Sequence, residues 1–124
     1  MEKKVLVVDD DPDICELIRV TLSTKGYVVK IAQTGIEGIE NVGTFSPDLI
    51  LLDMTLPDMD GMDVAKKIKG TEAGKNASIL LMSGRGMVLN EIDNTLFAGT
   101  LNKPFSLADL AKEAEKYASD RRSQ

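Results

Sequence analysis

Acidic side chains follow two short apolar runs in this sequence. Residues 5–8 are followed by the aspartates at 9–11, and residues 49–52 are followed by Asp53. Short aliphatic runs bounded by polar residues are typical of buried strands in a parallel sheet, and ligands of such sheets bind at the carboxyl ends of the strands. Two carboxylates about 4 Å apart repel each other by roughly 4 kcal/mol at an effective dielectric constant near 20. The pattern therefore predicts a site whose repulsion a cation or a proton must relieve.

Two further strand-like runs end at Ser83 and Lys103, whose side chains suit phosphoryl chemistry. Asp10 and Asp53 could ligate a hard divalent cation such as Mg²⁺, which prefers oxygen ligands. Asp53 could attack phosphorus as a carboxylate nucleophile, while Lys103 and the metal stabilise charge on the transferring phosphoryl oxygens. Ser83 could donate its hydroxyl to the acyl phosphate product. Any of these residues alone is more often a helix cap, a turn or a surface residue, but these four together with Asp9 favour a functional site.

Strands and helices alternate along the chain that must position these groups. Strands are expected at residues 4–9, 28–32, 48–53, 78–82 and 100–102, and helices at residues 12–25, 35–43, 62–70, 88–97 and from 106 onward. Five strands alternating with five helices predict an α/β fold with a parallel sheet covered on both faces. Right-handed crossovers favour the doubly wound, flavodoxin-like strand order 2-1-3-4-5, whose switch point lies between the strands that precede Asp9 and Asp53. We expect one domain over residues 1–120 and a polar tail at 121–124.

Composition and charge exclude several classes of function. The chain has 124 residues, a formal net charge of −5, no histidine and one cysteine, Cys15. An acidic chain is not expected to bind nucleic acid or an anionic membrane surface. The lack of histidine excludes Ser-His-Asp catalysis and histidine-ligated metal sites. A lone cysteine forbids an internal disulfide and no apolar stretch could span a bilayer, so we expect a reducing, cytoplasmic setting.

Four sequence motifs carry a family resemblance that covers the whole chain. They are VLVVDDDPDI at 5–14, PDLILLDMTLPDMDG at 47–61, ILLMSG at 79–84 and NKPF at 102–105. In their order and spacing the chain resembles the receiver domains of two-component response regulators, in particular single-domain regulators of the chemotaxis type. The resemblance implies a phosphoacceptor switch in a phosphorelay, and not an enzyme beyond self-phosphorylation and self-dephosphorylation.

The resemblance also implies a role for each site residue. Asp53 is the implied phosphoacceptor, Ser83 takes the place of the switch hydroxyl, and Lys103 contacts the phosphoryl group. The peptide bond between Lys103 and Pro104 is expected to be cis, as in other receivers. The implied ligands of Mg²⁺ are the carboxylates of Asp9, Asp10 and Asp53 and the backbone carbonyl of Thr55.

Partner proteins follow from the same resemblance. The implied donor is a phosphohistidine on a sensor histidine kinase or a histidine phosphotransfer protein, and output passes by contact to an unknown downstream protein. The chain itself is expected to be a monomer or a weak dimer. Receivers dock such donors on the first helix, and here its apolar residues span roughly 220° of the helix wheel, where a core-facing stripe needs little more than about 100°. We expect a partner surface at Ile14, Cys15, Pro104 and Phe105, although a deeply buried helix explains the apolar surplus equally well.

The chain departs from the family pattern at Thr100, where receivers usually carry Tyr or Phe three residues before the lysine. In the family this ring moves inward as the hydroxyl after the fourth strand moves toward the phosphate, and threonine cannot fill the same volume. We therefore expect a reshaped switch that involves Ser83, Thr100 and the glycine-containing segment 84–99. Alternatively, Phe97 supplies the aromatic ring from a nearby position.

Two other functions stay open. A degenerate receiver that takes no phosphate would act as an interaction module; Thr100 leaves room for this function, but the complete acidic set opposes it. A haloacid-dehalogenase-like phosphatase also uses a strand-end aspartate with Mg²⁺. That class carries Asp-x-Asp at its first strand and normally needs a larger chain, whereas Asp53 follows the third expected strand.

Overall fold

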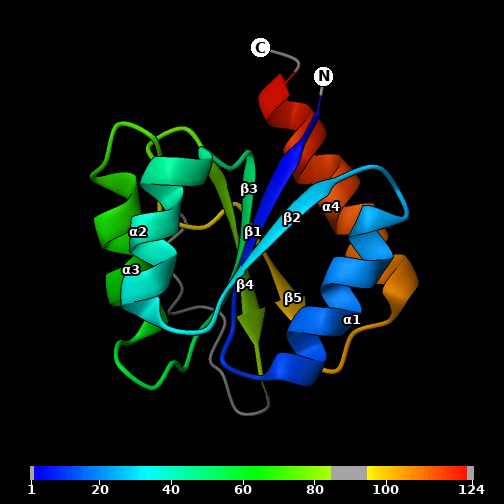
Figure 1. Cartoon of the computed structure of the whole chain (residues 1–124), viewed down its shortest axis with the longest axis horizontal. Coiled ribbons are helices and arrows are strands. Elements are labelled where there is room, and N and C mark those ends of the chain that lie inside the picture. The colour runs from blue at the N-terminus through cyan, green and yellow to red at the C-terminus, as the bar shows by residue number, and fades with distance from the viewer. Residues whose placement is uncertain (1, 85–94, 123–124) are drawn as a thin grey trace.

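A computed structural model of the protein describes residues 2–84 and 95–122. A five-stranded sheet forms the centre of the molecule (Figure 1). The strands are β1 (Lys4–Val8), β2 (Val28–Ala32), β3 (Leu49–Asp53), β4 (Ser78–Ser83) and β5 (Gly99–Asn102). They lie in the order β2-β1-β3-β4-β5, and all four pairings are parallel. The predicted α/β fold and strand order are therefore confirmed.

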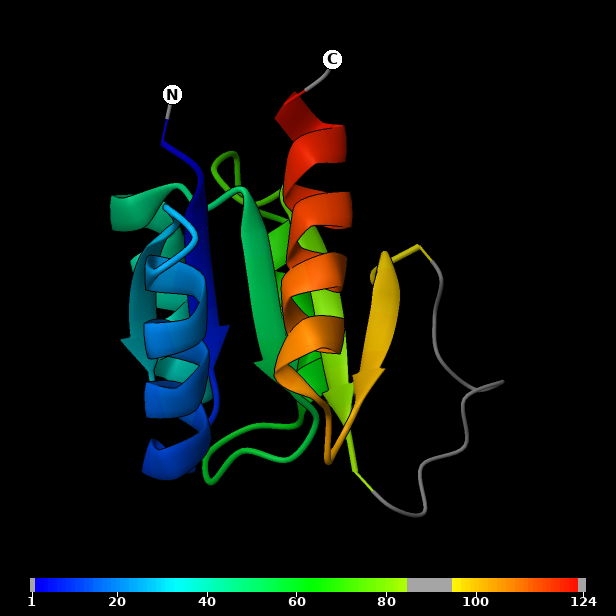
Figure 2. The ribbon, with the colours of Figure 1, turned by 90° about the vertical axis from the view of Figure 1, so that its right-hand side faces the viewer.

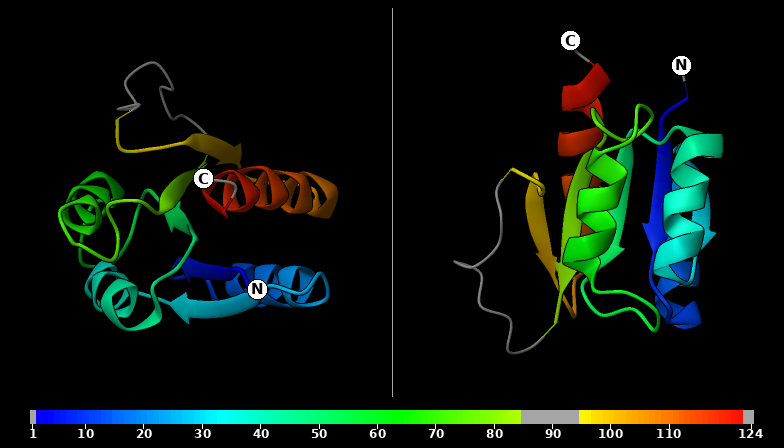
Figure 3. Two further views of the ribbon diagram at one scale, coloured as in Figure 1. Left: turned by 90° about the horizontal axis from the view of Figure 1, so that it is seen from above. Right: turned by 90° about the vertical axis from the view of Figure 1, so that its left-hand side faces the viewer.

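Four helices lie within the described residues. They are α1 (Pro12–Ser23), α2 (Gly35–Phe45), α3 (Gly61–Lys69) and α4 (Leu107–Arg122). α1 and α4 cover one face of the sheet, while α2 and α3 cover the other (Figures 1 and 3). The helix expected near 88–97 falls mainly on residues 85–94, which lie outside the described part of the chain, and residues 95–98 are not helical. None of the helices described here combines the length and the apolarity needed to cross a bilayer.

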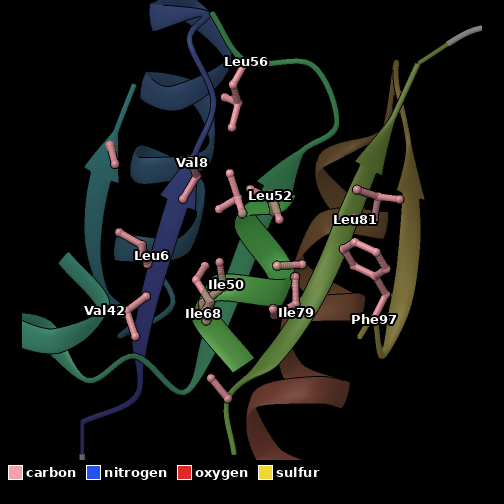
Figure 4. Close-up of a cluster of buried hydrophobic side chains, with 14 residues drawn as sticks. Leu6, Val8, Val42, Ile50, Leu52, Leu56, Ile68, Ile79, Leu81 and Phe97 are labelled. Carbon is pink, nitrogen blue, oxygen red and sulfur yellow. The ribbon is translucent and has the colours of Figure 1, made fainter. Parts of the chain in front are cut away.

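The core consists of two layers of side chains, one on each face of the sheet. Leu49 and Leu51 of β3 point into the cluster under α1 and α4, while Ile50 and Leu52 point into the cluster under α2 and α3. Figure 4 shows the second cluster, which also holds Phe97. All four leucine and isoleucine residues of β3 are fully buried. A central strand buried on both faces requires a continuous aliphatic run, which is the pattern that predicted it.

Short-range signals define where the helices begin and end. Asp11 caps α1 by accepting hydrogen bonds from the first turn, and Pro12 is the first helical residue, as expected. α1 ends at Ser23, two residues before the predicted end, and Gly26 then turns the chain toward β2 with a φ of 95°. This φ lies in the left-handed region that glycine adopts without steric cost. α4 continues through Arg122, past the expected domain end at residue 120.

The parallel arrangement brings all strand ends together at one edge of the sheet (Figure 2). Val8 of β1 pairs with Leu52 of β3, so the residues that follow them are neighbours. Ser83 of β4 is opposite Asn102 of β5 at the same edge. The predicted site residues are thus assembled by the strand register.

Candidate functional site

Three carboxylates meet where β1 and β3 end. Asp9 follows β1 directly, Asp10 comes next along the chain, and Asp53 is the last residue of β3. Carboxylate oxygens of these three residues lie within 4.8 Å of one another. Asp9 is fully buried, the side chain of Asp53 is 14% exposed, and Asp10 is exposed. The cluster therefore reaches solvent on the side of Asp10.

Lys103 inserts its ammonium group between two of these acids. Its Nζ donates to Asp9 Oδ2 at 2.7 Å and to Asp53 Oδ1 at 3.3 Å. The Lys103 N–H donates to the Ser83 carbonyl at 2.7 Å, and the Lys103–Pro104 peptide bond is cis, as the resemblance implied. Three carboxylates against one ammonium leave two formal negative charges. The charge and the all-oxygen donor set both fit a hard divalent cation.

Burial and charge change the proton affinity of Asp53 and Lys103. Burial, followed by the negative charge of Asp9, raises the pKa of Asp53 above its ordinary value, and Lys103 only partly opposes this rise. Burial works to lower the pKa of Lys103, but the hydrogen bond and charge of Asp9 and the charge of Asp53 raise it overall. A carboxylate with a raised pKa is a more basic nucleophile, and an ammonium with a raised pKa stays charged at neutral pH.

Cys15 lies beneath the acidic cluster rather than at the surface. It is 2% exposed, and its thiol donates to the backbone carbonyl of Asp9 at 3.1 Å. Burial, with the charge of Asp9 adding to it, raises the pKa of Cys15 to about 11, so the thiol stays neutral. The prediction that Cys15 contributes to a partner surface is wrong, because α1 turns this residue toward the sheet.

The exposed apolar flank of α1 begins one turn further along the helix. Leu17 and Val20 are 44% and 46% exposed, whereas Ile14 is half-buried. A shallow groove of about 390 Å³ runs between α1 and α4, with Val20 in its lining. Pro104 is exposed and Phe105 is half-buried. Apart from Cys15, the residues predicted for a partner surface are therefore accessible at least in part.

Ser83 has a hydrogen-bond partner that was not predicted from the sequence. Its hydroxyl donates to Oδ1 of Asn102 at 2.7 Å, and Ser83 is only 1% exposed. Asn102 is the residue before Lys103 and is opposite Ser83 in the register of β4 and β5. A polar residue at the end of an apolar strand is the only signal of this contact in the sequence, since the pairing depends on the register.

The loop from β3 to α3 passes along the same edge of the sheet (Figure 2) and carries Thr55, which is exposed. Thr55 forms an isolated antiparallel bridge with Asp60, and the N–H of Gly61 donates to the Met54 carbonyl at 2.7 Å. A Cβ on Gly61 would lie 2.7 Å from the Asp53 carbonyl oxygen and 2.8 Å from Met54 Cα. The loop therefore closes tightly against the end of β3 only because position 61 is glycine.

Asp58 fastens this loop to α2. Its two carboxylate oxygens accept hydrogen bonds from the backbone N–H groups of Gly35 at 2.7 Å and Ile36 at 2.9 Å. The first N–H groups of a helix lack partners within the helix, and the helix dipole favours a negative charge there. These hydrogen bonds hold the pKa of Asp58 below its ordinary value. No local pattern in the sequence indicates this contact, because the two partners lie 23 and 22 residues from Asp58.

Replacing Asp58 by alanine is expected to lower the melting temperature at pH 7 by a few degrees, as the loss of a helix cap does. Because folding depresses the pKa of Asp58, its stabilising contribution is present above the unfolded value of 3.8 and is lost as the pH falls through the lower, folded value. The melting temperatures of wild type and Asp58→Ala, followed by circular dichroism, should therefore differ by a constant amount down to about pH 4 and begin to converge as the pH falls below 3.8. Glu40→Ala, an exposed change on α2, is the control. A difference between Asp58→Ala and wild type that persists unchanged at pH 3 contradicts the cap.

The predicted switch residue Thr100 is half-buried in β5, opposite Leu81 of β4. Phe97 is 4% exposed and belongs to the same buried cluster as Leu81 (Figure 4). An aromatic ring thus lies near β4 from a position three residues before Thr100, as the alternative interpretation proposed. Most of the segment predicted to be reshaped, residues 85–94, lies outside the described residues.

The sequence of this chain matches that of a known protein family over most of its length. The family model of the response regulator receiver domain matches residues 5–115. Response regulator MprA of Mycobacterium tuberculosis is 36% identical over 113 residues, which cover 89% of this chain and 48% of that protein. The chain therefore spans about half the length of the curated relatives that it matches.

Solved structures resemble the fold over nearly its whole length. A CheY-like receiver domain protein from Methanospirillum hungatei has a TM-score of 0.91 at 26% identity, covering 99% of this chain and 98% of that chain. CheY4 of Vibrio cholerae has a TM-score of 0.87 at 27% identity, covering 94% and 99%. The receiver domain of sensor histidine kinase PA1611 from Pseudomonas aeruginosa, which has a magnesium ion in its active site cleft, is 24% identical with a TM-score of 0.86, covering 96% and 99%. With its acidic strand ends and its matching family model, the chain belongs to the response regulator receiver domains of two-component signalling.

Proposed function

We propose that the protein is a signalling switch in which Asp53 accepts a phosphoryl group from a phosphohistidine. The donor would be a sensor histidine kinase or a histidine phosphotransfer protein. The observation that carries this proposal is the contact of Lys103 with both Asp9 and Asp53 at the sheet edge. It places a carboxylate with a raised pKa next to a fixed cation, and both groups border a site open to solvent.

In the proposed transfer, a carboxylate oxygen of Asp53 forms a bond to phosphorus. The bond between phosphorus and the donor's imidazole nitrogen breaks, and its electron pair returns to the ring. Lys103 lies 3.3 Å from Asp53 Oδ1, where its charge stabilises the phosphoryl oxygens during transfer. Ser83, at the end of the adjacent strand, would donate its hydroxyl to the resulting acyl phosphate.

The residues present at this edge fit Mg²⁺. Asp9, Asp10 and Asp53 supply three carboxylates within 4.8 Å, and Thr55 would add its backbone carbonyl from the neighbouring loop. When bound, Mg²⁺ would neutralise charge on the phosphoryl oxygens. The magnesium ion in the cleft of the PA1611 receiver domain supports this assignment.

Receiver domains are signalling domains, and we propose that output here passes by protein contact to a downstream partner. A donor histidine must reach Asp53 at the carboxyl edge, which Ile14 and Phe105 border. The exposed flank at Leu17 and Val20 extends this border along α1. The proposed setting is cytoplasmic, with the protein as a monomer or weak dimer.

The test is to incubate the protein with acetyl phosphate and Mg²⁺ and to measure its intact mass. Wild type should gain one phosphoryl group, and Asp53→Asn should gain none. Asp63→Asn, an exposed change in the first turn of α3, should behave as wild type. A chelator added before the donor should prevent the gain. An adduct that persists in Asp53→Asn, or its absence from wild type in Mg²⁺, would refute the acceptor role, and steady hydrolysis of phosphomonoesters would instead indicate a phosphatase.

A further inference from the structure

The Ser83 hydroxyl is already paired inside the sheet. Ser83 is 1% exposed, and its Oγ donates to Asn102 Oδ1 at 2.7 Å. β4 and β5 place these residues opposite each other, and the Lys103 N–H holds the Ser83 carbonyl at 2.7 Å. The strand register therefore fixes this pair at the edge where the site residues converge.

A serine hydroxyl carries one proton and donates one hydrogen bond at a time. The proposed function requires that proton at a phosphoryl oxygen on Asp53. Asn102 and the phosphoryl group consequently compete for the same hydroxyl. Asn102 takes no part in the phosphoryl transfer described above. Its hydrogen bond with Ser83 therefore acts only on the equilibrium between the resting state and the phosphorylated state.

We propose that Asn102 is a positioning residue that holds the Ser83 hydroxyl in a resting orientation and thereby sets the cost of the phosphorylated state. This inference rests on the proposed function of Asp53. Asn102 is exposed, so water can pair with its amide once the hydroxyl has left. The Ser83 hydroxyl is buried and therefore needs a hydrogen-bond acceptor in both states: Asn102 in the resting state and a phosphoryl oxygen in the phosphorylated state. The competition therefore depends on one hydrogen bond and requires no repacking of the core.

Removing the acceptor should favour the state that carries a phosphoryl group. In Asn102→Ala the resting Ser83 hydroxyl loses its partner, while its hydrogen bond to a phosphoryl group remains available. One neutral hydrogen bond typically changes an equilibrium constant by about five-fold. Beryllium fluoride, which mimics a phosphoryl group on a carboxylate, should therefore bind Asn102→Ala about five-fold more tightly than wild type in excess Mg²⁺.

A double-mutant cycle tests whether this gain acts through Ser83. Calorimetric titration with beryllium fluoride compares wild type, Asn102→Ala, Ser83→Ala and the double variant. Asn102→Ala should tighten the binding of beryllium fluoride when Ser83 is present and should leave it unchanged in the Ser83→Ala background. A merely structural effect of the substitution would change the affinity in both backgrounds. Asn41→Ala removes an amide from α2 and is the control. Asn102→Val also lacks the acceptor and keeps side-chain volume, so it replaces the alanine variant if that variant does not fold.

The outcomes separate this inference from the proposed function. Unchanged or weaker binding by the Asn102 variants, or an equal gain in the Ser83→Ala background, overturns the role of Asn102 and leaves the acceptor role of Asp53 intact. If wild type binds no beryllium fluoride in excess Mg²⁺, the proposed function fails and this inference fails with it.

Discussion

Lys103→Met is expected to lower the free energy of unfolding of the metal-free protein by about 2–3 kcal/mol at pH 7. Lys103 pairs with Asp9 at 2.7 Å, and the Asp9 side chain is 1% exposed. Methionine keeps much of the volume but leaves Asp9 buried without its cation, beside Asp53. This loss of stability is at or below the lower end of the range found when one partner of a buried ion pair is removed, because the Lys103 side chain is itself 21% exposed. Urea unfolding in the presence of a chelator measures it.

Mg²⁺ should partly replace the missing charge of Lys103. The rise in melting temperature on adding Mg²⁺ should therefore be larger in Lys103→Met than in wild type, since a ligand that binds only the folded state stabilises it. Lys75→Met is the matched control, because Lys75 pairs with Glu72 at the surface, with side chains 52% and 85% exposed. Removing such a pair should change stability by less than about 0.5 kcal/mol. Equal stability of the two lysine variants would contradict a structural role for the contact with Asp9.

Gly61→Ala is expected to destabilise the protein by about 1–3 kcal/mol, the range found for overpacked sites. The added Cβ would lie 2.7 Å from the Asp53 carbonyl oxygen and 2.8 Å from Met54 Cα. Both atoms belong to the backbone, so relief requires movement of the loop that carries Thr55. Thermal and urea unfolding measure the loss, and the stabilisation by Mg²⁺ should shrink in parallel if Thr55 contributes a ligand.

Gly43→Ala provides the matched comparison for Gly61→Ala. Gly43 is exposed within α2, and a Cβ there would meet nothing within 4 Å. Alanine in an exposed helix interior should therefore stabilise the protein by about 0.5–1 kcal/mol. Opposite signs for the two substitutions would show that the cost at Gly61 comes from the close approach to the backbone. A loss of similar size at both positions would refute that explanation.

The fold and the acidic site could be predicted because both depend on local patterns. The aliphatic runs before Asp9 and Asp53 are long enough to identify strands buried on both faces. Once the strand order is known, parallel pairing brings these two residues together without further information. The oxygen donor set and the position of Lys103 after the last strand follow from the same order.

The contacts of Asn102 and Asp58 could not be predicted, because each depends on where two distant backbone segments lie relative to each other. Asn102 faces Ser83 only in the observed register of β4 and β5, and Asp58 reaches from the loop after β3 to the N-terminus of α2. The error at Cys15 has a related cause. Apolar residues cover so much of the surface of α1 that the sequence does not show which of them face the sheet. In the structure Cys15 faces the sheet, and Leu17 and Val20 are exposed.

The position of β1 also affects how the chain can fold during synthesis. β1 lies between β2 and β3, so one of its edges stays unpaired until residue 53 has left the ribosome. Such non-local parallel pairing is intrinsically slow to form. The pairing that completes β1 also forces Asp9 toward Asp53, while Lys103 is synthesised 50 residues after Asp53. A nascent chain therefore meets the repulsion of its own site before Lys103 has been synthesised, and at that stage a dissolved cation or a proton can reduce the repulsion.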